Sequence, residues 1–129
     1  NNIAMNKNIN FYGKVQNMKL IYNQNDIVVL PSWREGLSKS LIEAASMSLP
    51  IITTNVPGCE EIIENNQSGI IVPLKNKFFL KEAIKKLIKN PQLGMEYGLR
   101  ARDLVKKKFE VSLINKKILK IYKDLLFEK

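Results

Sequence analysis

The feature that most constrains the fold is an alternation of short apolar runs with helix-length amphipathic segments. Residues 26–32, 50–56 and 69–74 are runs rich in Ile and Val, each containing or bordered by Pro. Uninterrupted β-branched runs of this length are typical of strands that are buried on both faces of a parallel sheet. Residues 9–13, INFYG, predict a further short strand that ends at a glycine.

The segments between and after these runs carry apolar residues at helical spacing. We expect short helices over 18–25, from about Ser38 to Met47, and over 58–66; longer helices follow over 78–90, 93–109 and 111–127. This order predicts an α/β fold, a Rossmann-like parallel sheet with helices on both faces followed by C-terminal helices.

Length and composition narrow the class of protein. A chain of 129 residues has room for one domain, and its 45% hydrophobic and 26% charged residues are normal for a globular protein. No run approaches the roughly 18 apolar residues of a membrane span, and the first residues lack the apolar region of a secretory signal. The single cysteine, Cys59, suits a reducing compartment, so we expect the cytoplasm.

The charge balance is unusual, at +9 with no histidine. Without histidine and with one cysteine, no metal site is expected. Two interpretations of the C-terminal lysines stay open: a solvated helix face, or a stripe that contacts acidic lipids, formed by Lys116, Lys117, Lys120 and Lys123. A nucleic-acid-binding interpretation rests on the charge alone.

The loop after the first buried run is the candidate site, because ligands of open parallel sheets bind beyond the carboxyl ends of the strands. It opens the stretch PSWREGLSKSLIEAA (31–45). The helix expected to begin near Ser38 offers unpaired amides and a partial positive charge, which favour a phosphate. Ser38, Lys39 and Ser40 would supply those amides, and Gly36 would allow close backbone approach.

Two carboxylates, Glu35 and Glu43, stand eight positions apart in this stretch. A carboxylate beside a phosphate is repulsive unless hydrogen-bond donors lie between them, and sugar hydroxyls are such donors. Hydrogen bonds to charged groups contribute about 1.5–3 kcal/mol each. A ligand with a sugar on each side of a phosphate group, such as a nucleotide sugar, would suit both glutamates. The other interpretation is that both are ordinary charges near a helix N-terminus.

These residues resemble the E-x7-E signature of the retaining glycosyltransferases of family 4, which have the two-domain GT-B fold. The glutamates lie within a series of short motifs that follow one another along the chain in the order PS, EG, EA, P, T, PG, E, G and VP. The resemblance extends from NINFYGKV to the segments AIKKLIKNP and IYKDLL of the last helices. It implies that residues 1–129 are a single, partial domain: the C-terminal, donor-binding half of such an enzyme, without its N-terminal acceptor domain.

The resemblance also implies a role for each residue of the candidate site. Glu35 takes the catalytic position and binds hydroxyls of the donor sugar. Glu43 holds the ribose hydroxyls, and Lys14 and Val15 lie against the base. The donor sugar and its diphosphate would be bound along the loop and the helix start, by Gly36, Leu37, Ser38, Lys39 and Ser40.

The activity implied is transfer of a hexose from a nucleotide-diphosphate sugar to a glycan or lipid-linked acceptor, in bacterial surface polysaccharide synthesis. No cofactor or metal is expected, and the location would be cytoplasmic, with peripheral contact at the inner membrane face. Positive groups that stabilise the leaving diphosphate would lie outside this chain, so the isolated fragment is expected to be inactive. Two other classes stay open: a non-catalytic Rossmann-like nucleotide-binding or protein-interaction module, and a nucleic-acid binder. Paired carboxylates oppose the last.

Overall fold

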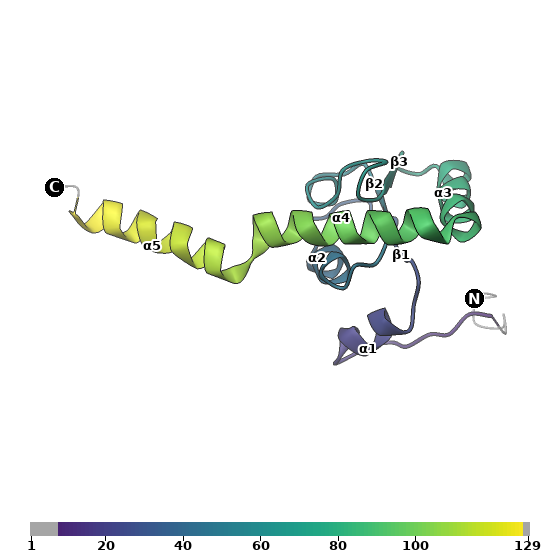
Figure 1. Ribbon diagram of the computed structural model, residues 1–129, viewed down its shortest axis with the longest axis horizontal. Coiled ribbons are helices and arrows are strands. Elements are labelled where there is room, and N and C mark those ends of the chain that lie inside the picture. Colours follow the sequence, from purple (N-terminus) through teal and green to yellow (C-terminus); the bar gives the residue numbers. More distant parts are fainter. Residues whose placement is uncertain (1–7, 128–129) are drawn as a thin grey trace.

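The computed structural model describes residues 8–127, which form three strands and five helices. Figure 1 shows the strands at the centre, with helices packed around them. In chain order the elements are α1 (Met18–Asn23), β1 (Val28–Leu30), α2 (Lys39–Ser46), β2 (Ile51–Thr54), β3 (Ile70–Val72), α3 (Lys77–Lys89), α4 (Pro91–Phe109) and α5 (Val111–Phe127).

The three strands form one parallel sheet in the order β1-β2-β3. Val28 pairs with Ile51, and Ile52 pairs with Ile70. Because the strands are parallel, their carboxyl ends lie along one edge of the sheet. The loops that follow Leu30, Thr54 and Val72 therefore all begin at that edge. The expected parallel α/β sheet is confirmed.

Helices cover both faces of the sheet, as the sequence predicts. On one face, α2 and the later part of α4 pack against Ile51; their buried residues include Leu41, Ala44, Ala45, Ala101 and Val105. On the other face, α3 and the earlier part of α4 pack against Ile52 and Ile70 through Ala83, Leu87 and Tyr97. Successive residues of a strand point to opposite faces, so β2 is fully buried.

Strand β1 differs from the expectation for residues 26–32, because its three residues are only half-buried. It is an edge strand of the described sheet, with β2 on one side only. Residues 9–13 do not form the expected strand either, because the described residues give this segment no neighbouring strand to pair with. Gly13 adopts a left-handed φ of 59°, as in a turn.

Residues 58–62 form turns, and Asn65 makes an isolated bridge to Gly69, so the expected helix over 58–66 is wrong. Gly58 has a φ of 79°, which a helix does not allow. Ile62 and Ile63 are buried in the core, and the backbone N–H of Glu64 donates to Ser68 Oγ at 2.7 Å. The apolar spacing that suggested a helix therefore reflects a loop whose isoleucines anchor it to the core.

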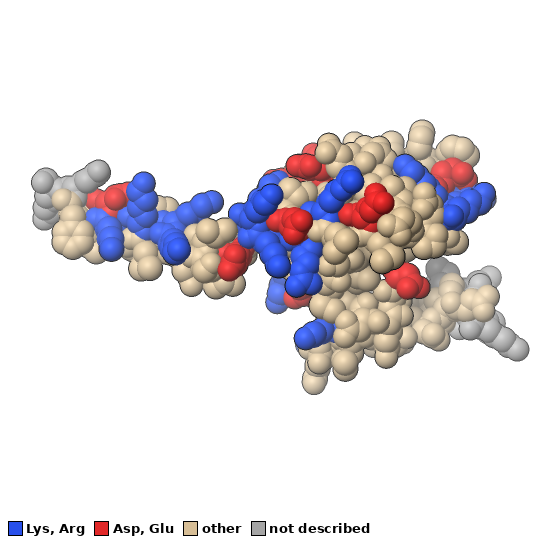
Figure 2. Space-filling view, in the orientation of Figure 1, with Lys and Arg blue, Asp and Glu red and all other residues tan. Residues whose placement is uncertain are grey.

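The C-terminal helices match the expected ranges within two residues, and the largest difference is the start of α4, at Pro91 instead of residue 93. The extended conformation of Glu110 separates α4 from α5. Helix α5 extends away from the rest of the chain (Figure 1) and buries none of its residues against the described part. Lysine and arginine side chains lie along α5 and the end of α4 (Figure 2). Within residues 8–127, no helix has the length and apolarity to cross a bilayer.

Candidate functional site

The candidate site lies where the β1–α2 loop meets the first turn of α2, at the carboxyl end of β1. Ser38 is the residue before the helix, and its side chain makes no capping hydrogen bond within the described structure. Its hydroxyl lies 3.2 Å from that of Ser40 instead. The first amides of α2 therefore lack a side-chain acceptor, which suits an anionic ligand.

Glu35 is half-buried, and a chain of hydrogen bonds ties its carboxylate to the ends of two strands. Ser32 Oγ, just beyond β1, donates to Glu35 Oε1 at 2.8 Å. The carbonyl of Ser32 in turn accepts from Thr54 Oγ1, at the end of β2, at 2.5 Å. The position of Glu35 is therefore set by the sheet and not by the loop alone.

The backbone of Gly58 packs directly against the β1–α2 loop. A Cβ added at Gly58 would lie 1.3 Å from the carbonyl oxygen of Gly36, so only glycine fits this approach. The amide of Ser38, expected to face the ligand, donates to the carbonyl of Gly58 at 3.3 Å. The amides of Gly36 and Leu37 have no hydrogen-bond partner among residues 8–127, so these two remain available to a ligand.

Glu43, one turn inside α2, is bracketed by two partners. Lys39 Nζ lies 3.6 Å from Oε1, and the hydroxyl of Tyr22 lies 3.5 Å from Oε2. The hydroxyl has one proton, which is shared between the carbonyl of Ser40, at 3.1 Å, and Glu43 Oε2. Burial raises the pKa of Tyr22 above its ordinary value of 10.0, and the charge of Glu43 raises it further. The phenol therefore stays protonated, and able to donate, at neutral pH.

A cleft of about 370 Å³ separates the segment around α1 from α2, and Glu43 lies on its wall. The residues expected at the base, Lys14 and Val15, do not line this cleft, but the next two residues do. Its lining residues are Gln16, Asn17, Met18, Lys19, Tyr22, Ile42, Glu43, Ser46 and Met47. Whether Lys14 and Val15 contact a base stays a prediction.

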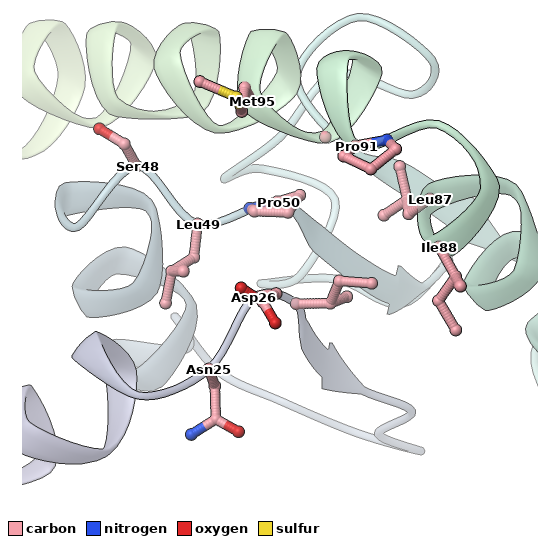
Figure 3. A pocket seen from close by; sticks show the side chains of 11 residues that line it. Asn25, Asp26, Ser48, Leu49, Pro50, Leu87, Ile88, Pro91 and Met95 are labelled. Atoms are coloured by element: carbon pink, nitrogen blue, oxygen red, sulfur yellow. The ribbon is translucent and has the colours of Figure 1, made fainter.

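A larger cleft, of about 610 Å³, lies at the opposite, amino-terminal ends of β1 and β2 (Figure 3). Leu87 and Ile88 of α3 and Met95 of α4 form part of its wall. Among its described lining residues, Asp26 is the single charged side chain. We assign the functional site to the smaller cleft and the β1–α2 loop, because open parallel sheets bind ligands at the carboxyl ends of their strands.

The structure brings most of the predicted site residues together on one loop and one helix turn. These are Glu35, Gly36, Leu37, Ser38, Lys39, Ser40 and Glu43. Three supporting residues, Ser32, Tyr22 and Gly58, were not predicted. The pair Pro57-Gly58 offers a signal, since glycine after proline favours a turn, whereas the helical spacing over 58–66 points to a helix. Nothing local to Tyr22 points to Glu43, which is 21 positions away.

Comparison with known proteins gives the family. Residues 2–104 match the model of the family described as glycosyl transferases group 1. The chain is 31% identical over 126 residues to the capsular polysaccharide biosynthesis glycosyltransferase CapM of Staphylococcus aureus. That match covers 98% of this chain and 33% of CapM, so the chain spans about a third of its relative's length.

Solved structures of glycosyltransferases share the fold. One from Rickettsia africae superposes with a TM-score of 0.86 and 26% identity, over 99% of this chain and 35% of its own. The C-terminal domain of a glycosyl transferase group 1 family protein from Francisella tularensis superposes with a TM-score of 0.70 and 26% identity, over 80% of this chain and 53% of its own. These matches confirm the α/β fold expected of GT-B enzymes.

A further structure carries ligands. A mutant of TarM from S. aureus, solved in complex with fondaparinux, α-GlcNAc-glycerol and UDP, superposes with a TM-score of 0.75 and 26% identity, over 81% of this chain and 21% of its own. The family model, the sequence relatives and the solved structures agree. The chain belongs to the glycosyl transferases group 1 family.

Proposed function

We propose that this chain is the donor-binding domain of a retaining, family 4 glycosyltransferase that transfers a hexose from a nucleotide-diphosphate sugar. The observation that carries the proposal is the placement of Glu35 and Glu43 at the two ends of an uncapped helix start, at the carboxyl edge of the sheet. This arrangement offers amides for a phosphate between two carboxylates for hydroxyl groups.

The diphosphate of the donor would lie against the start of α2. The amides of Gly36 and Leu37 have no partner in the described part of the chain, and Lys39 begins α2, where the helix dipole favours negative charge. Negative charge that develops on the leaving diphosphate would be stabilised there by fixed dipoles, which cost no reorganisation during the reaction. This requires no metal or cofactor from the chain.

The two carboxylates would recognise the sugars on either side of the diphosphate. Glu35, held by Ser32, would accept hydrogen bonds from hydroxyls of the transferred hexose. Glu43 would accept from the ribose, with the base in the cleft next to it and near Lys14 and Val15. A carboxylate can accept from two neighbouring hydroxyls at once, which fits a ribose diol.

The relatives guide the choice of substrate and pathway. CapM is named for capsular polysaccharide biosynthesis, and the TarM mutant was solved with UDP. We therefore take UDP as the first nucleotide to test and a glycan or lipid-linked glycan of the bacterial surface as the acceptor. The enzyme would work in the cytoplasm, at the inner face of the membrane.

The chain spans a third of CapM, and we propose that the acceptor would be bound by residues outside these 129. The 129-residue chain alone would bind donor without transferring sugar. Release of free or transferred hexose by this chain from a UDP-sugar, with any acceptor, would contradict that proposal.

Isothermal titration with UDP tests the donor site directly. Glu43→Ala is expected to weaken binding about tenfold or more, since a hydrogen bond to a charged group is worth about 1.5–3 kcal/mol. Glu82→Ala is the matched control, because Glu82 is also a half-exposed helix glutamate paired with a lysine one turn away. Absence of saturable binding by UDP and other nucleoside diphosphates, or equal loss in both variants, would overturn the proposal.

A further inference from the structure

We propose that Tyr22 is a positioning residue for the donor site: its hydroxyl fixes the carboxylate of Glu43 for recognition of the ribose. This inference rests on the ribose-binding role proposed for Glu43. Tyr22 lines the same cleft as Glu43, and the role inferred for it is exerted through Glu43.

The placement of Tyr22 supports this role. Tyr22 is 6% exposed as a whole residue and packs in the core cluster that includes Leu41 and Ala44 of α2. From that anchored position its hydroxyl reaches two oxygens one helical turn apart, Ser40 O at 3.1 Å and Glu43 Oε2 at 3.5 Å. The phenol therefore connects α1 to the turn of α2 that carries the carboxylate.

The other partner of Glu43 cannot hold it in place. The side chain of Lys39 is 89% exposed, and its ammonium lies 3.6 Å from Glu43 Oε1. Exposed ion pairs of this kind are worth about 0–1 kcal/mol and are screened by salt. Without the phenol, a glutamate with a 38% exposed side chain would sample several rotamers and lose entropy when ribose binds.

The hydroxyl also has the right chemistry to support ribose binding. Burial keeps the pKa of Tyr22 above its ordinary value, so it donates throughout the neutral range. Each carboxylate oxygen accepts more than one hydrogen bond, so the phenol proton, which is shared between Ser40 O and Oε2, leaves room at Oε2 for ribose hydroxyls. The alternative is that Tyr22 only fills the core, and a phenylalanine would then serve equally well.

The test compares UDP with 2′-deoxy-UDP. The ratio of their affinities reports the contribution of the ribose 2′-hydroxyl to binding and not the stability of the fold. The wild-type chain is expected to prefer UDP, and Tyr22→Phe should lower that preference about threefold or more, within the range of one hydrogen bond. Its affinity for 2′-deoxy-UDP should change less than twofold. Tyr97→Phe is the matched control, since Tyr97 is 3% exposed in the other core cluster.

A double-variant cycle with Glu43→Gln completes the test. If Tyr22 acts through Glu43, Tyr22→Phe should lower the preference no further once Glu43→Gln is present. An unchanged UDP preference in Tyr22→Phe overturns the positioning role. Absent UDP binding, or no effect of Glu43→Gln on the preference, overturns the ribose-binding role of Glu43 and the inference with it.

A second measurement applies if Tyr22→Phe does not fold. The chain has four tyrosines, so 3-fluorotyrosine labelling gives few signals, which Tyr→Phe variants of Tyr12, Tyr97 and Tyr122 assign by elimination. The fluorine resonance of residue 22 is expected to shift more with UDP than with 2′-deoxy-UDP. Equal shifts with both nucleotides would contradict the inference.

Discussion

At the scale of single residues, the conformation of the β1–α2 loop depends on one close contact between two backbone segments. Gly58 has a φ of 79°, and a Cβ there would lie 1.3 Å from the carbonyl oxygen of Gly36. The loop that carries Glu35 therefore rests directly on the backbone of residue 58. Any other residue at this position must push the two segments apart.

We expect Gly58→Ala to lower the free energy of unfolding by about 1–3 kcal/mol, because it adds both a clash and a strained left-handed alanine. Affinity for UDP should fall with it, since Gly36 and Leu37 would move. Gly36→Ala is the control for stability: its added Cβ meets nothing within 4 Å. Urea unfolding measures the free energy of unfolding of the two variants. An equal loss of stability in Gly58→Ala and Gly36→Ala would contradict the close contact between residues 58 and 36.

The site was predictable from sequence where its residues are neighbours along the chain. Glu35 and Glu43 stand in one stretch, so a strand end followed by a helix start was enough to place them together. Tyr22 and Gly58 could not be found this way. Their contacts, with Glu43 and Gly36, join segments about 20 positions apart and depend on how α1 and the β2–β3 connection fold back.

At the scale of elements, the helices differ in how they begin. Asn76 before α3 accepts from Phe78 N and Phe79 N, and Asn90 before α4 accepts from Leu93 N. Ser38 before α2 makes no such bond within the described structure, although serine is a favourable capping residue. Asn17 before α1 makes no capping bond among the described residues either, and these two open starts, of α1 and α2, both border the candidate site.

This difference predicts an order of stabilities. Asn76→Ala and Asn90→Ala should each lower the free energy of unfolding by about 1 kcal/mol, the usual cost of a lost cap. Neither should change UDP affinity. Ser38→Ala should cost less than either, since it removes no cap from α2. Chemical denaturation ranks the three variants, and a Ser38→Ala cost equal to that of Asn76→Ala would show that Ser38 caps α2 in solution.

Elements with a strong local pattern were predicted well, and elements that depend on distant partners were not. The stripe in 78–90 gave α3 almost to the residue. Residues 9–13 have strand propensity, but a strand needs a neighbour, and the described chain provides none. Residues 58–66 show helical spacing because Ile62 and Ile63 must both reach the core, which turns can also achieve.

At the scale of the whole molecule, charge and exposed apolar surface are concentrated towards the C-terminus. Helix α5 carries Lys116, Lys117, Lys120 and Lys123, and its exposed apolar residues include Ile118, Ile121, Tyr122 and Leu125. Figure 2 shows this basic surface extending from the end of α4 along α5. Such a helix combines the two properties of a peripheral membrane contact.

We therefore expect the chain to float with vesicles that contain anionic lipid more than with neutral vesicles. Each lysine near a negatively charged surface contributes about 1 kcal/mol, and salt should weaken the effect. Replacing these four lysines with glutamine should remove the preference. The control replaces Lys77, Lys81, Lys85 and Lys86, which lie on α3. Equal flotation with neutral and anionic vesicles would leave the solvated-face interpretation of these lysines.

The central claim is that a nucleoside diphosphate binds at the β1–α2 loop, and amide chemical-shift mapping by NMR tests it most directly. On addition of UDP, the largest changes are expected at Gly36, Leu37, Lys39 and Ser40, with smaller ones at Gln16 and Asn17 on the wall of the adjoining cleft. Changes confined to the cleft at the other end of the strands, around Asp26 and Met95, would contradict the account.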